Sequence, residues 1–138
     1  MELMFAFLCD YADQSSGKLT AVGIGIDTIY AMAVPASHPF IYGVLGMRFN
    51  IVEVGPKRLG VRIIDADGNN ILPALDVSAN VDNPPPGYTN RNLRVAIVLR
   101  DLLFPRFGDY AVSFLVEGQE VARVPVKVAQ PPSLPPTA

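Results

Sequence analysis

Apolar residues alternate with polar or small ones along much of this chain, and this period of two constrains the fold more than any other feature. The alternation is clearest over residues 93–99, 110–117 and 120–128. Successive side chains of a β-strand point to opposite faces, so each of these segments presents one apolar face to a core. β-Branched and aromatic residues are frequent in them, which favours strands over helices. We therefore predict an all-β chain.

Turn-forming residues divide the alternating pattern into eight predicted strands. Ser15-Ser16-Gly17 and Asp67-Gly68-Asn69 are two such turns, since their residues tolerate positive φ or close a turn through a side chain. Glu117-Gly118 is the strongest hairpin signal, because Gly118 lies in a two-residue turn between two alternating strands. The predicted strands cover 3–11, 19–31, 41–54, 58–66, 71–81, 93–99, 110–117 and 120–128.

Two segments depart from this pattern. The leucines within 99–103 have helical spacing ahead of a proline, so we expect one helical turn over 100–104 that crosses between sheets. Residues 130–138 are rich in proline and are expected to form a disordered tail. Eight short strands separated by turns predict a two-sheet β-sandwich domain over residues 1–129.

Charge and hydropathy narrow the range of partners. The formal net charge of −2 leaves no electrostatic footprint for nucleic acid or an anionic membrane. The arginines of segment 91–106 are interpreted as a solvated strand face, because aspartates are interspersed among them. No run of residues approaches the about 18 apolar positions that a membrane helix needs. The single cysteine, Cys9, fits a reducing compartment, so we expect a cytoplasmic protein.

Few residues of this chain point to catalysis. His38 is the single histidine and is expected in a proline-flanked loop, and Cys9 is expected to be a buried, inert thiol. One histidine and one cysteine do not make a zinc site. The pair Gly23-Ile24-Gly25 lacks the third glycine and the helix of a dinucleotide fingerprint. We expect no enzymatic activity, no cofactor and no metal.

A ligand-binding role stays open as an alternative. Asp65-Ala66-Asp67-Gly68-Asn69 resembles the start of a calcium loop but departs from it at the sixth and twelfth positions, and a structural turn explains it better. The alternative function is binding of a carbohydrate, a lipid headgroup or weakly bound calcium at the loops. Its candidate ligand residues are Tyr30, His38, Tyr42, Asp65, Asp67 and Tyr88.

The segment Phe107-Gly108-Asp109-Tyr110 resembles the tyrosine corner of immunoglobulin-like sandwiches. The resemblance implies a structural role for Tyr110 and Gly108, with Tyr110 clamping the chain near Phe104 and Pro105, and the hairpin signal gives Gly118 a structural role as well. The cysteine pair and the tryptophan of antibody domains are missing, so the resemblance implies only the architecture.

A second resemblance covers most of the chain. Leu8-Cys9-Asp10-Tyr11-Ala12, the run 17–23, Gly108-Asp109-Tyr110 and the run 117–120 are similar to a family of uncharacterised bacterial proteins. That family implies a β-sandwich and no assigned activity.

We therefore expect a non-enzymatic interaction or structural module with a protein partner. The first strand is apolar on both faces, with Leu3, Phe5 and Phe7 alternating with Met4 and Ala6. A strand buried on both sides has this pattern. We predict that it lies mid-sheet or contributes to a homodimer interface.

Overall fold

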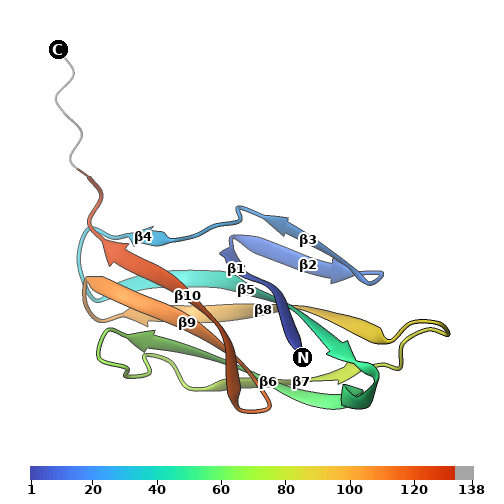
Figure 1. Ribbon diagram of the computed structural model, residues 1–138. Helices are drawn as coiled ribbons and strands as arrows, with labels where there is room; N and C mark the ends of the chain where they lie inside the picture. Colours follow the sequence, from blue (N-terminus) through green and yellow to red (C-terminus); the bar gives the residue numbers. More distant parts are fainter. Residues whose placement is uncertain (133–138) are drawn as a thin grey trace.

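The computed structural model describes residues 1–132 as two packed β-sheets with a hairpin beside them (Figure 1). The three-stranded sheet is antiparallel and has the order β1 (Glu2–Cys9), β5 (Ala36–Asn50), β8 (Asn90–Phe104). The five-stranded sheet has the order β4 (Thr28–Tyr30), β10 (Gln119–Ala129), β9 (Gly108–Val116), β6 (Gly55–Asp65), β7 (Leu75–Val81). The hairpin, at the upper right of Figure 1, consists of β2 (Tyr11–Ser15) and β3 (Lys18–Val22).

The main core fills the space between the two sheets. Val112 and Phe114 of β9 point into it from the five-stranded sheet, and Leu45 and Met47 of β5 point into it from the other sheet. Each strand contributes alternate residues, as the period of two predicts. The all-β prediction is confirmed, and residues 1–132 add a separate two-stranded sheet, the β2–β3 hairpin, to the two packed sheets.

A second, smaller core lies on the opposite face of the three-stranded sheet, under the β2–β3 hairpin. Cys9, Ala12 and Val44 are its buried centre, and Phe5 and Phe7 of β1 pack against it. β1 is therefore apolar on both faces because the main core covers one and the hairpin covers the other. β1 ends its sheet, so the mid-sheet position predicted for it is wrong.

Residues 1–132 form ten strands rather than the predicted eight. The predicted strand 19–31 is two strands, β3 and β4, because the chain leaves the hairpin after Val22 and re-enters a sheet only at Thr28. Residues 11–15, expected at a strand end and in a turn, form β2 and pair with β3 around Ser16-Gly17, where both residues have positive φ. The predicted turn at Ser15-Ser16-Gly17 is present, but the strand before it is β2 and not the end of the first strand, which stops at Cys9.

Two observed strand boundaries differ from the predicted ones, because a polar side chain or a proline changes the hydrogen bonding of the backbone there. The predicted strand 41–54 ends at Asn50, whose side chain accepts the Val52 N–H and caps a short 3-10 helix over Ile51–Glu53. The predicted strand 71–81 begins only at Leu75, because Pro73 has no N–H for the ladder. The hairpin predicted at Glu117-Gly118 joins β9 to β10.

The helical turn predicted over 100–104 is wrong, because β8 continues to Phe104 and pairs with β5 along its length. Asp101 has a φ of 55°, which allows Leu99 and Leu102 to lie in the main core although they are three residues apart. The leucine spacing therefore reflects a locally altered strand rather than a helix.

The predicted tail lies mostly beyond the described part of the chain, which ends at residue 132. Up to that residue, no helix is long and apolar enough to cross a membrane.

Candidate functional site

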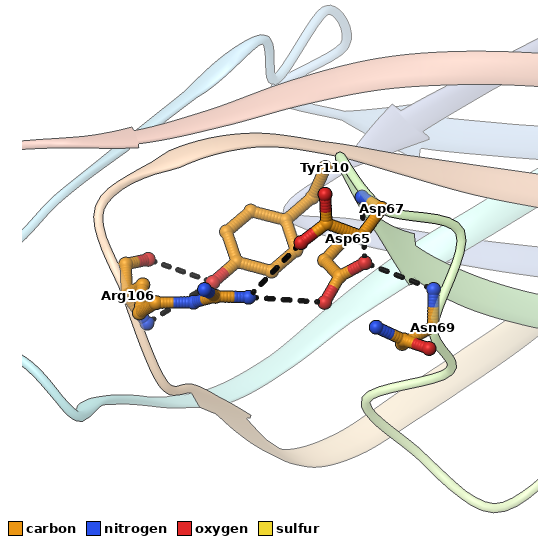
Figure 2. A network of polar contacts seen from close by, with 5 residues as sticks. All are labelled: Asp65, Asp67, Asn69, Arg106 and Tyr110. Carbon is orange, nitrogen blue, oxygen red and sulfur yellow. Dashed lines mark hydrogen bonds and ion pairs between the residues drawn. The ribbon is translucent and has the colours of Figure 1, made fainter.

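Asp65 ends β6 and organises the turn that follows it (Figure 2). Its Oδ1 atom accepts the backbone N–H groups of Asp67 and Asn69, both at 2.9 Å. An aspartate that closes a turn through its own side chain makes contacts of this kind. The Asp67-Gly68 turn predicted from the sequence is therefore held by Asp65.

Arg106 links this turn to the connection between β8 and β9. Its Nη2 atom lies 3.4 Å from Asp65 Oδ2 and 3.6 Å from Asp67 Oδ2. The Tyr110 hydroxyl donates to the Arg106 carbonyl oxygen at 2.7 Å and accepts the Arg106 N–H at 3.2 Å (Figure 2). The clamp implied by the tyrosine-corner resemblance thus holds Arg106, one residue beyond the predicted pair.

These contacts determine the charge state of Asp65. The Asn69 N–H contributes most to lowering the pKa of this carboxyl, partial burial opposes it, and the Asp67 N–H and Arg106 lower it further. The carboxylate is ionised at neutral pH, and its oxygens already have partners. A cation would compete with the Arg106 guanidinium for both aspartates, so the geometry does not favour calcium. Within residues 1–132, no group of three or more His, Cys, Asp or Glu residues could hold a metal ion.

The other predicted ligand residues are dispersed over the fold. Tyr30 is exposed at the end of β4, and Tyr88 is exposed in the connection between β7 and β8. His38 lies within β5 rather than in the predicted loop, because segment 36–40 pairs with the end of β8. Tyr42 lies further along β5, where its ring meets the exposed Tyr11 ring edge-on at 5.3 Å. These four residues and the two aspartates do not line one pocket.

A different site opens between the two sheets beside β7 and β8, and we call it the apolar slot. Its volume is about 320 Å³. It exists because β7 begins only at Leu75, so the preceding segment leaves the sheet and the slot reaches Val61 and Ile63, which belong to the main core. The slot is lined by Val61, Ile63, Leu72, Pro73, Leu75, Val98, Leu99 and Arg100.

β8 forms one wall of the apolar slot and ends the three-stranded sheet. β5 is its one ladder partner among residues 1–132, and the other edge of β8 is free. Backbone N–H and C=O groups of alternate residues face outward along such an edge. Sequence reasoning missed this site, although Pro73 inside a predicted strand was a signal that the sheet stops there.

Comparisons with known proteins place the chain in a family without assigning it an activity. A model of a family of unknown function, DUF6941, matches residues 4–129. The chain belongs to this family. No curated protein matches it. The DUF6941 match runs from β1 to the end of β10, so it includes the Asp65 turn, the apolar slot and the free edge of β8.

The family of unknown function that the sequence resemblance implied is therefore confirmed. A bacterial origin and the immunoglobulin-like type stay predictions.

Proposed function

We propose that this DUF6941 domain is a non-enzymatic interaction module that binds an extended segment of a protein partner. The observation that carries the proposal is the free edge of β8 beside the apolar slot. An unpaired strand edge offers backbone donors and acceptors that an added strand can satisfy. The slot offers the side chains of that strand an apolar site next to the main core.

The polar groups of the domain support a binding role over a catalytic one. The Asp65 and Asp67 carboxylates both lie within 4.0 Å of Arg106, and the Asp65 carboxylate also closes a turn. His38 is held in a β5 strand pair, away from those carboxylates in the fold. A cytoplasmic location belongs to the same proposal, because the buried, unpaired thiol of Cys9 suits a reducing compartment.

A displayed library of random heptapeptides, panned against the domain, tests the proposal. We expect enrichment of extended, apolar peptides whose binding shifts the backbone amide resonances of residues 96–100. Leu75→Asp puts a charge at the mouth of the slot and should weaken these peptides about tenfold or more, which is about 1.4 kcal/mol.

Leu3→Asp is the matched control, because Leu3 is a leucine of similar exposure to Leu75 (43% against 36%). It lies on β1, at the edge of the three-stranded sheet away from β8. It should bind the enriched peptides as the unchanged domain does. Peptides that keep their affinity for the Leu75→Asp domain, or that shift amides on another surface, would overturn the proposal.

A further inference from the structure

The outer face of β8, which turns away from the main core, carries two arginines. Arg94 lies opposite Gly46 of β5, and Arg100 lies opposite Phe40. Among residues 1–132, no carboxylate oxygen lies within 4.0 Å of either guanidinium. Arg94 donates to the Gly17 carbonyl oxygen at 3.5 Å, and Arg100 is exposed.

The residues between these arginines separate into two faces. Ala96 packs against the second core on the outer face, whereas Ile97 and Leu99 belong to the main core on the inner face. Residues 94 and 100 are six positions apart, which is about 20 Å along an antiparallel strand. A partner strand of seven residues therefore spans both arginines and the part of β8 that lines the apolar slot.

We propose that the partner strand is acidic on its outer face and apolar on its inner face; this inference rests on the proposed function. Its first and seventh residues carry carboxylates opposite Arg94 and Arg100, and its second, fourth and sixth residues are apolar and face inward, with the one opposite Leu99 at the slot. Opposite charges directly across a strand pair attract, and like charges repel. Arg94 and Arg100, which lack an ion-pair partner among the described residues, thus favour an added strand with negative charges opposite them.

A second copy of this chain fits the same edge poorly. An antiparallel pair of β8 strands centred on Ile97 would place Arg94 of each strand opposite Arg100 of the other. Like charges in that position destabilise the pair. We infer that the occupant is an acidic segment of a different protein.

Three seven-residue peptides with the same apolar residues at positions two, four and six test this inference. Positions one and seven are Glu in the first peptide, Gln in the second and Lys in the third. The Glu peptide should bind up to about fivefold tighter per charge pair than the Gln peptide at low salt. The advantage should shrink at high salt, because exposed charges are screened.

Arg100→Glu should weaken binding of the Glu peptide by about tenfold, because the charge pair at position 100 becomes repulsive. It should strengthen binding of the Lys peptide, because the same pair becomes attractive. Arg58→Glu is the matched control, because Arg58 is an exposed arginine of β6 whose guanidinium has no carboxylate oxygen within 4.0 Å among the described residues. It changes the net charge equally and should leave the order of the three peptides unchanged.

The possible failures are distinguishable. Equal binding of the three peptides, with shifts in the β8 amide resonances, would overturn the charge preference and leave the proposed function standing. If none of the peptides shifts those resonances, and the display library yields none that does, the proposed function falls as well. Sedimentation as a dimer with β8 amides protected at the interface would identify a second copy as the occupant and overturn the inference.

Discussion

The three-stranded sheet ends in β1 on one side and in β8 on the other, and the two edges differ in how they are covered. The Leu8 carbonyl oxygen of β1 accepts the N–H groups of Gly25 at 2.9 Å and Ile26 at 3.3 Å, which come from the segment after the hairpin. A β-bulge between Leu3 and Phe5 interrupts the rest of that edge. β8 pairs with β5 without a register shift from Asn90 to Phe104.

The difference indicates which edge is available to a partner. Bulges and covering loops are devices that keep sheet edges from pairing with other chains. β1 has both devices, and its second half, from Phe5 to Cys9, is covered by the main core on one face and by the hairpin on the other. β8 keeps one register with β5 on one side, although its backbone is altered at Asp101, and has the apolar slot next to its free side. Changes that loosen β1 should therefore cost stability, whereas changes beside β8 should cost binding.

The largest expected effect comes from Gly46→Val, which would detach β1. A Cβ atom at position 46 would lie 2.5 Å from two carbons of the Phe5 ring, so the ring would have to leave the second core. Overpacking costs about 1–3 kcal/mol, and loss of the buried ring area adds to it, so we expect about 3 kcal/mol of destabilisation. Urea unfolding of the two proteins measures the difference.

The double variant separates this clash from other effects of a larger residue. In a Phe5→Ala background the ring is absent, so Gly46→Val should cost less than half as much as in the unchanged chain. The same cost in both backgrounds would mean that β1 is not fastened through Phe5.

The sequence predicts β1 correctly as a strand with two apolar faces, but only its second half, from Phe5 to Cys9, is covered on both, and the sequence does not show what covers it. The alternation of Phe5, Ala6 and Phe7 is local and can be read directly. Phe5 and Phe7 are covered by β2 and β3. Which edge of β1 lacks a partner strand depends on its pairing with β5, more than thirty residues away. Such long-range pairing is not encoded in a two-residue period.

The candidate site illustrates the same limit. The turn at Asp65 follows from Asp and Gly spacing, and its position could be predicted. Arg106, which completes the network, is 41 residues away and is brought there by the β6–β9 pairing. The apolar slot depends on Pro73 ending the sheet near β8, and strand order was the property that the sequence left open.

Tyr110→Phe should have an intermediate effect, because it loosens the connection that leaves β8. The Tyr110 ring is buried, and its hydroxyl makes two bonds to the backbone of Arg106. Removing them should destabilise the domain by about 1–2 kcal/mol in urea unfolding. Amide exchange of residues 102–104 should accelerate at the same time.

Tyr30→Phe is the control for that change, because Tyr30 is 58% exposed and its hydroxyl makes no protein hydrogen bond among residues 1–132. Its free energy of unfolding should stay within about 0.5 kcal/mol of the unchanged chain. Similar losses in both variants would show that the clamp at Arg106 does not contribute to stability.

The smallest expected effect is the dependence of stability on pH through Asp65, whose turn precedes the wall of the slot. The pKa of Asp65 is lowered from its ordinary 3.8, so its stabilisation is fully present above that value and is lost as the pH falls through the lowered pKa. Asp65→Asn keeps an oxygen that can accept the Asp67 and Asn69 N–H groups but removes the charge that Arg106 neutralises. The unchanged chain should therefore be more stable than the variant at neutral pH.

That difference should begin to narrow as the pH falls below about 4, because the carboxyl of the unfolded chain then takes up a proton, and the native carboxyl becomes neutral like the amide only at lower pH. Urea midpoints of both proteins, measured in steps from pH 7 to about pH 3, give the two curves to compare. Parallel curves would mean that the charge of Asp65 does not hold the turn, and the slot would then be framed by the backbone of segment 65–75 alone. If the two curves converge at low pH and Asp65→Asn leaves peptide binding unchanged at neutral pH, Asp65 stabilises the structure beside the β8 site and does not contact the peptide.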